Sequence, residues 1–266
     1  MRARRPGRRC SAPRTDAPAR VVLAAISYWL VMPAAGSGTR LHADAQLGAR
    51  AGAEAWPAVP KQYLPLAGAT VIEHALAPFR ADPRCEGIVV ALAAGDRWWQ
   101  ALPAARDPRV VTVTGGRERG DSVAAGLAAV RARVGMRDPW VLVHDAARPC
   151  ASDEELGRLL AAIEHAPHGA LLALRMTDTV KRAGEDGCVV ATVERARLWR
   201  ALTPQAFRLR RLETALASGG PASDEAGAVE RLGDRPRLVP GSPLNIKITE
   251  PADLVLARRV LTGSPA

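Results

Sequence analysis

The sequence is poor in lysine and lacks cysteines at disulfide or metal-binding spacing. Of its 37 basic side chains only three are lysines, at positions 61, 181 and 247, so arginine is its default cation. The four cysteines lie far apart, with no Cys-x-x-Cys pair and no histidine at zinc-ligand spacing. These absences exclude a disulfide framework and a structural zinc site, and they suit a reducing cytoplasm.

The sequence also lacks an apolar run of the roughly 20 residues that a transmembrane helix needs. Residues 21–32 form a shorter apolar run after an arginine-rich start, which imitates a secretory signal. That run leads directly into a glycine-rich stretch at 33–38, and cleavage nearby would remove or displace the stretch. We therefore expect a cytoplasmic protein with no membrane partner.

The excess of positive charge is concentrated at the start of the chain. The net charge is +10, and residues 1–20 hold seven Arg and one Asp, which leaves +4 for the rest. A segment this rich in Arg, Pro and Ala predicts a basic disordered leader over residues 1–20. A solvated leader and a nucleic-acid-binding arm both fit it. Elsewhere basic residues alternate with acidic ones, so we expect no nucleic acid partner.

Short apolar runs alternate with helix-like stretches along most of the chain. Continuous apolar runs without alternation are typical of a parallel sheet that is covered on both faces. We therefore predict one α/β domain over residues 21–262. The expected strands are 21–32, 87–92, 110–113, 140–143 and 170–174, and the expected helices between them are 70–79, 121–134 and 152–165.

The pattern changes after residue 174. Residues 178–182 and 188–193 predict two short strands around a Gly-Glu-Asp-Gly turn, which would form an arm protruding from the sheet over about residues 175–200. Helices are expected at 208–217, 224–232 and 251–261, with a short strand at 245–249. Two helix starts are also predicted, with Asp121 or Ser122 as one N-cap and a capping box of Ser152 and Glu155 at the other.

The strongest local motif is the glycine-rich stretch that follows the first expected strand. Small residues and two glycines at 33–38 let backbone N–H groups surround phosphate oxygens, and Arg40 adds a fixed positive charge. The stretch is not a Walker A loop, and Leu41 stands where a dinucleotide fingerprint has Gly or Ala. A plain turn remains the alternative. The following segment, 41–60, is a lid over the site or an inert insertion.

The scarcity of lysine singles out its few positions. Lys61 follows a proline and Lys247 lies in the expected strand 245–249, and both could converge on a phosphate as a compact positive charge. Ordinary surface lysines are the alternative, and that interpretation fits Lys181 better.

Two further strands end in polar residues. The strand at 140–143 leads to His144, Asp145 and Arg148, and the carboxyl ends of parallel strands line binding crevices. We expect Asp145 to hold Mg²⁺ through oxygen, or else to pair structurally with Arg148, and His144 to be packed rather than to carry a proton. After the strand at 110–113, Gly116, Arg117 and Ser122 fit a base or ribose contact, or only a loop and a helix cap.

Together these segments closely resemble the 2-C-methyl-D-erythritol 4-phosphate cytidylyltransferases of the non-mevalonate isoprenoid route, from residue 31 to residue 261. The resemblance implies a Rossmann-like, mostly parallel sheet of the nucleotide-diphospho-sugar transferase type. It rests on eight ordered motifs: Pro-Ala-Ala-Gly-Ser-Gly at 33–38, Pro-Lys-Gln-Tyr at 60–63, Asp-Ser at 121–122, Val-His-Asp-Ala-Ala-Arg-Pro at 143–149, Asp-Thr at 178–179, Leu-Thr-Pro-Gln at 202–205, Ser-Asp-Glu-Ala at 223–226 and Asn-Ile-Lys-Ile-Thr at 245–249.

The resemblance also implies a role for each motif residue. CTP would be held by Ala34, Ala35, Gly36, Gly38, Gly116, Arg117 and Ser122. The catalytic cations would be Arg40, Lys61 and Lys247, with Mg²⁺ beside Asp145. Methylerythritol phosphate would meet Thr179 and Arg195 on an arm that reaches into the partner subunit of a homodimer, and Arg148 and Thr203 would complete the pocket.

The chain departs from the family pattern in its basic leader and in segment 41–60, which holds twenty residues where the family has a few. Other functions therefore stay open. The nearest is another small-molecule nucleotidyltransferase, such as a ribitol-5-phosphate cytidylyltransferase. A non-catalytic nucleotide-binding homologue and a nucleic-acid-binding protein are the alternatives from other classes.

Overall fold

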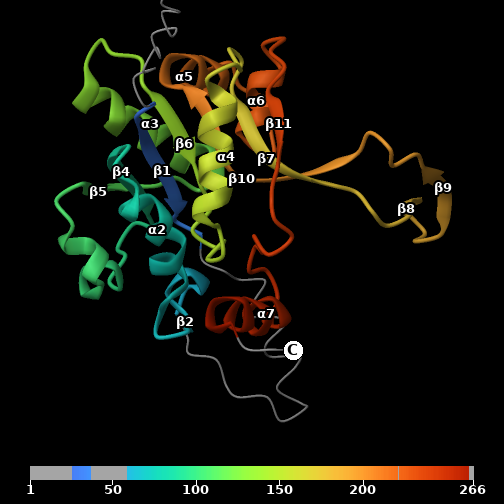
Figure 1. Ribbon diagram of the computed structural model, residues 1–266, viewed down its shortest axis with the longest axis horizontal. Coiled ribbons are helices and arrows are strands. Elements are labelled where there is room, and N and C mark those ends of the chain that lie inside the picture. Colours follow the sequence, from blue (N-terminus) through green and yellow to red (C-terminus); the bar gives the residue numbers. More distant parts are fainter. Residues whose placement is uncertain (1–25, 37–58, 221, 264–266) are drawn as a thin grey trace, which may run out of the picture.

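A seven-stranded sheet forms the centre of the molecule (Figure 1). The computed structural model describes residues 26–36, 59–220 and 222–263. The strand order is β11-β7-β10-β6-β1-β4-β5. In chain order these strands are β1 (Tyr28–Ala34), β4 (Cys85–Leu92), β5 (Val110–Thr114), β6 (Trp140–Val143), β7 (Ala170–Arg175), β10 (Trp199–Arg208) and β11 (Arg237–Pro240).

The sheet is mostly parallel, as predicted. β1 pairs in parallel with β4 and β6, β4 with β5, and β7 with β11. β10 runs antiparallel between β6 and β7, with a register irregularity between Ala201 and Gln205. The α/β prediction is therefore confirmed, while β10 and β11 are strands that the sequence pattern did not reveal.

Helices cover both faces of this sheet. On one face lie α2 (Val71–Ala81) and α4 (Asp153–Ile163), and on the other α3 (Arg119–Val134), α5 (Leu209–Ala217) and α6 (Glu225–Glu230). Helix α7 (Pro251–Thr262) lies apart from the sheet, and the short 3₁₀ turns are η2 (Lys61–Tyr63), η3 (Trp99–Ala101) and η4 (Pro103–Arg106). In the described chain no helix is long and apolar enough to span a bilayer.

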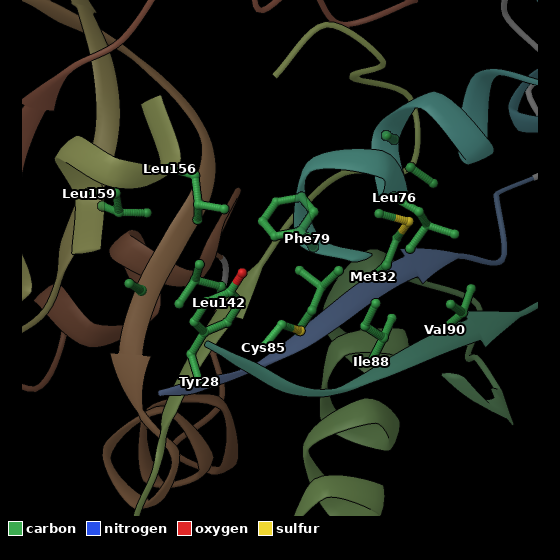
Figure 2. Close-up of a cluster of buried hydrophobic side chains, with 14 of the residues drawn as sticks. Tyr28, Met32, Leu76, Phe79, Cys85, Ile88, Val90, Leu142, Leu156 and Leu159 are labelled. Atoms are coloured by element: carbon green, nitrogen blue, oxygen red, sulfur yellow. The ribbon is translucent and has the colours of Figure 1, made fainter. Parts of the chain in front are cut away.

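Successive side chains of β1 point to opposite faces of the sheet, so the core has two layers. Tyr28, Leu30 and Met32 pack with α2 and α4 on one face, and Figure 2 shows Phe79 of α2 and Leu156 of α4 in that layer. On the other face, residues 29 and 31 pack with α3, α5 and α6. Burial of both faces is what a continuous apolar strand requires. A third, smaller cluster joins α7 to the hairpin of β2 (Pro65–Leu66) and β3 (Ala69–Thr70).

The predicted arm is present as a separate two-stranded ribbon. β8 (Val180–Ala183) pairs antiparallel with β9 (Val189–Val193), and the ribbon extends far from the sheet in Figure 1. Its side chains are mostly exposed, and Val189 and Val190 are 64% and 61% exposed. The arm thus has little packing of its own within one chain.

Two local predictions were wrong. The helix expected from Asp121 begins at Arg119 instead, because Asp121 accepts the Glu118 N–H from inside the first turn rather than capping the helix itself. Residues 245–249 form no strand and run as an irregular segment past the site. The Ser152–Glu155 capping box is confirmed. The leader 1–20, residues 21–25 and most of segment 41–60 lie outside the described residues.

We expect Gly126→Ala to destabilise the fold, because a Cβ there would lie 2.4 Å from Cγ1 of Val31 where α3 crosses β1. Overpacking of this kind costs about 1–3 kcal/mol. Gly157→Ala is the matched control, since Gly157 lies inside α4 with no atom near its added Cβ, and it should gain about 0.5–1 kcal/mol. Urea unfolding measures both, and an unchanged Gly126→Ala midpoint would contradict the close contact.

Candidate active site

The candidate site is a cleft of about 230 Å³ at the carboxyl ends of the strands. Three loops reach it, following β1, β5 and β6, where parallel α/β sheets bind ligands. The turn η2 before α2 and an irregular segment before α7 also line it. Its lining residues are Pro33, Ala34, Ala35, Gly36, Lys61, Gln62, Gly116, Arg117, Glu118, Arg119, Ser122, Asp145, Ala146, Ala147 and Lys247.

The start of the glycine-rich stretch is held by a buried glutamine. Gln62 Nε2 donates to the carbonyl oxygens of Ala34 and Gly36 at 2.7 and 3.2 Å. These two bonds engage carbonyl groups, and the loop's N–H groups are the part suited to an anion. Gln62 was not predicted as a site residue, although it stands beside Lys61. The predicted residues Gly38 and Arg40 lie outside the described residues.

The loop after β5 packs tightly against the glycine-rich stretch. A Cβ on Gly115 would lie 2.7 Å from both Ala35 Cβ and Ser122 Oγ, and one on Gly116 would lie 2.2 Å from Asp121 Cβ. Ser122 is buried, and its Oγ accepts the Gly116 N–H at 3.2 Å. Ser122 therefore shapes this loop, while exposed Arg117 lines the cleft.

The two lysines singled out by sequence lie in the same cleft. Lys61 Nζ donates to the carbonyl oxygen of Ile248 at 2.9 Å. Lys247 Nζ lies 2.8 Å from Oδ2 of Asp145. Positions 186 residues apart in the chain thus meet beside Gly36, as predicted, and they concentrate positive charge there. Lys181, by contrast, bonds Thr192 on the arm.

Asp145 is the centre of the site's ion pairs. Arg119 Nε lies 2.9 Å from its Oδ1, and Arg148 Nε lies 3.7 Å from its Oδ2. Burial alone would raise the pKa of Asp145, but Arg119 and Lys247 hold that pKa well below its usual range. The carboxylate is therefore ionised, although only 7% of the residue is exposed.

Arg119 and Glu225 were missed by sequence reasoning. Arg119 donates through both terminal nitrogens to Glu225, at 2.5 and 3.0 Å, in addition to its bond with Asp145. Burial alone would lower the pKa of Arg119, but the carboxylates of Glu225 and Asp145 raise it. Glu225 belongs to the Ser-Asp-Glu-Ala motif, whose role the sequence left unassigned. Because the sequence pattern predicted a helix that begins at residue 121, Arg119 was expected to lie outside that helix.

Arg148 and Thr203 lie behind the cleft rather than in its lining. Thr203 Oγ1 accepts the Asp145 N–H at 3.1 Å and lies 3.0 Å from His144 Nδ1. Arg148 donates to the carbonyl oxygen of Asn245 at 2.8 Å, and its buried Nε has no hydrogen-bond partner. Both residues therefore support the loop that carries Asp145.

His144 is packed, as expected, and takes part in that support. It is fully buried, and its Nε2 lies 3.1 Å from the carbonyl oxygen of Arg148. A carbonyl can only accept, so Nε2 carries the proton and Nδ1 accepts from the Thr203 hydroxyl. Burial lowers the pKa of His144 to about 4, which keeps the ring neutral at physiological pH.

Thr179 and Arg195 lie on the arm, away from the cleft lining. Arg195 Nη1 donates to Thr179 Oγ1 at 3.2 Å, and both side chains are exposed. Only the family resemblance predicted that these two residues contribute to the substrate site. Within one chain, Thr179 directly precedes β8 and Arg195 follows β9 by two residues, so both lie at the base of the ribbon.

The described residues contain no group of three His, Cys, Asp or Glu side chains arranged to hold a metal. Asp145 offers one ionised carboxylate at the cleft. Mg²⁺ is commonly held by one or two carboxylates while substrate phosphates and water fill its remaining positions. The donor set therefore fits a divalent cation that enters with a phosphate ligand, and it does not fit a cage of protein ligands.

Comparisons with known proteins agree on one family. The model of the 2-C-methyl-D-erythritol 4-phosphate cytidylyltransferase family matches residues 28–263. The protein of that name from Ectopseudomonas mendocina (strain ymp) is 48% identical over 236 residues, covering 87% of this chain and 94% of its own. The one from Pseudomonas syringae pv. tomato is 46% identical over 237 residues, covering 88% and 94%.

Solved structures give the same result. A crystal structure of 4-diphosphocytidyl-2C-methyl-D-erythritol synthase has a TM-score of 0.73 and 34% identity, covering 89% of this chain and 98% of that one. The 2-C-methyl-D-erythritol 4-phosphate cytidylyltransferase from Thermus thermophilus has a TM-score of 0.69 and 31% identity, covering 89% and 100%.

The neutral, buried His144 predicts a loss of stability in acid. Because its folded pKa of about 4 lies below the unfolded value of 6.5, the unfolded state binds more protons between these values, so stability falls as pH drops from 6.5 to 4. The full loss is at most about 3 kcal/mol. Urea unfolding at a series of pH values should show a shallower dependence in His144→Gln. Exposed His165→Gln should keep the wild-type dependence, and an equal slope in all three proteins would contradict the assignment.

Proposed function

This chain belongs to the 2-C-methyl-D-erythritol 4-phosphate cytidylyltransferase family, and from that premise we propose that its cleft transfers CMP from CTP to 2-C-methyl-D-erythritol 4-phosphate. The products are 4-diphosphocytidyl-2-C-methyl-D-erythritol and pyrophosphate. One observation carries this assignment to the cleft: the glycine-rich stretch, two of the chain's three lysines and an ionised aspartate meet in one place.

The nucleotide occupies the loops that follow β1 and β5. Backbone N–H groups around Ala34, Ala35, Gly36 and Gly38 receive phosphate oxygens, because small residues let the main chain approach an anion closely. Gly116 and Arg117, on the loop that Ser122 shapes, contact the base and ribose. The tight packing of Gly115 against Ala35 supports this division, since it fixes the two loops relative to each other.

The chemical step is an in-line displacement at the α-phosphorus of CTP. An oxygen of the acceptor's phosphate forms the new P–O bond, and the bond from the α-phosphorus to the bridging oxygen breaks as pyrophosphate leaves. The attacking phosphate is already anionic, so the step needs no general base. A neutral, enclosed His144 agrees with such a reaction.

Two anions must approach each other in this step, and nearby cations offset their repulsion. Arg40, Lys61 and Lys247 are the proposed catalytic residues, which stabilise negative charge on the α-phosphate and on the leaving pyrophosphate. Lys247 already lies in the cleft as the partner of Asp145, and its side chain is 40% exposed. It can therefore exchange that carboxylate for a phosphate oxygen.

Mg²⁺ is the proposed cofactor, and Asp145 is the residue that would hold it. When bound, the ion supplies positive charge to the phosphates. Thr203 and Arg148 keep the Asp145 loop in place for this role, through the backbone bond to Asp145 and the bond to Asn245.

The acceptor is proposed to bind between the cleft and the arm of a second copy. Thr179 and Arg195 offer a hydroxyl and a guanidinium suited to a sugar-alcohol phosphate, yet they lie at the base of a ribbon that protrudes from the sheet. The exposed valines of β9 support a homodimer in which the ribbon packs on its partner. The proposed compartment is the cytoplasm, which suits free thiols such as those of Cys85 and Cys150.

Purified protein should release pyrophosphate from CTP when 2-C-methyl-D-erythritol 4-phosphate is present, and Lys61→Ala should lower kcat by about 10²-fold or more. The reason is the loss of a transition-state cation. A coupled pyrophosphate assay measures both. Exposed Arg133→Ala, which removes a cation on α3 far from the cleft lining, should leave kcat unchanged.

Three outcomes would change the assignment. Faster turnover with ribitol 5-phosphate would identify the alternative acceptor while keeping the cleft chemistry. If CTP protected the protein against thermal unfolding but no acceptor gave turnover, the chain would be a non-catalytic nucleotide-binding homologue. Unchanged kcat in Lys61→Ala would remove Lys61 from the catalytic residues.

Mixing two inactive variants tests the shared site. We expect Arg195→Ala and Lys61→Ala each to lose most activity, and a re-equilibrated equal mixture to recover about a quarter of it, because half the dimers pair an intact cleft with an intact arm at one of their two sites. Initial rates measured before and after subunit exchange give the recovery. A mixture no more active than its components would place the arm outside the site.

A further inference from the structure

Arg119 connects the cleft carboxylate to a second carboxylate outside the cleft. Its Nε bonds Asp145 at 2.9 Å, while its two terminal nitrogens bond the two oxygens of Glu225. Arg119 lines the cleft, and Glu225 lies behind it at the start of α6. The guanidinium is thus shared between one carboxylate that faces substrate and one that does not.

The Glu225 end of this pair is fixed. Glu225 is 1% exposed and is the first residue of α6, whose N-cap Asp224 accepts hydrogen bonds from the Gly227 N–H and from the side chain of Gln205. Gln205 in turn accepts the Ala226 N–H at 2.9 Å. These bonds tie the first turn of α6 to β10, so the backbone that carries Glu225 is held in place.

Besides the more distant Arg148, Asp145 therefore has one fixed and one replaceable cation. Arg119 reaches Oδ1 while its other nitrogens are occupied, whereas Lys247 reaches Oδ2 from an irregular segment with a 40% exposed side chain. A bidentate Arg–carboxylate pair is strongly directional, whereas an ammonium reorients easily. A ligand that competes for the Asp145–Lys247 ion pair will consequently displace Lys247 from Asp145 before it displaces Arg119.

We infer that Glu225 is a positioning residue that neutralises Arg119 and restrains it, so that the carboxylate of Asp145 remains available to the divalent cation that enters with the nucleotide. Without Glu225, the full charge of Arg119 would act on Asp145 alone, and the guanidinium would be free to cover both of its oxygens. The cation would then compete with a fixed positive charge. This inference rests on the proposed function, because it concerns a metal that accompanies CTP.

The test is the affinity of the protein for Mn²⁺ in the presence of CTP and without acceptor. Binding is measured by electron paramagnetic resonance, as the decrease in the signal of unbound Mn²⁺. Glu225→Gln keeps the side-chain shape but removes the charge, and we expect it to weaken Mn²⁺ binding about tenfold. The matched control is Glu213→Gln on α5, because Glu213 also forms a two-bonded pair with an arginine of α3, accepting from Nε and Nη2 of Arg131 away from the cleft. That control should bind Mn²⁺ as the wild type does.

The double variant Arg119→Gln/Glu225→Gln separates charge from scaffolding. Removal of both charges should restore Mn²⁺ affinity to within about twofold of wild type, because no unpaired cation then faces Asp145. A purely structural pair predicts that the double variant binds at least as weakly as the single one. This comparison with wild type remains decisive even if Glu225→Gln alone does not fold.

Either of two results would overturn the inference: unchanged Mn²⁺ affinity in Glu225→Gln, or a double variant that stays weak. Failure of the proposed function would look different, since wild-type protein would then give no pyrophosphate release with CTP and acceptor. A wild type that turns over, together with a Glu225→Gln variant of normal Mn²⁺ affinity, refutes the positioning role alone.

Discussion

The charge on Asp145 is the constraint around which the site is organised. A carboxylate enclosed at the edge of a sheet costs free energy unless cations and hydrogen bonds compensate it. Arg119, Lys247 and Arg148 supply that compensation from three separate parts of the chain. Each of these contacts also fixes a loop, so the electrostatic balance and the shape of the cleft have the same origin.

The support for this carboxylate comes from within the fold. Thr203 holds the Asp145 backbone, and its hydroxyl is oriented by the neutral ring of His144. That arrangement exists because β10 enters the sheet antiparallel, next to β6, and so brings Thr203 to the carboxyl end of a strand that runs the opposite way. Thr203 and His144 thereby support the backbone of Asp145 by hydrogen bonds, while Asp145 lines the cleft.

The class of fold and the convergence of the lysines could be predicted from sequence. Continuous apolar runs separated by amphipathic stretches specify a covered parallel sheet, and the rarity of lysine drew attention to Lys61 and Lys247. β10 was missed because Trp199–Arg208 mixes arginines and a Thr-Pro-Gln sequence with its apolar residues, which hides the pattern of a buried strand. Arg119 and Glu225 were missed because a charged residue is expected to be solvated until its partner is known. Their pairing depends on contacts across 106 residues, which local pattern does not record.

The short turn η2 has a consequence for how this architecture can vary. Lys61 reaches Ile248, Gln62 holds the carbonyls of the loop after β1, and Tyr63 bonds Asp96. Three successive side chains thus anchor the turn to three different parts of the body, and the partners named here all lie outside segment 41–60. These contacts hold the turn without requiring a particular length of segment 41–60. The length of that segment can consequently differ while Lys61 keeps its contact with Ile248.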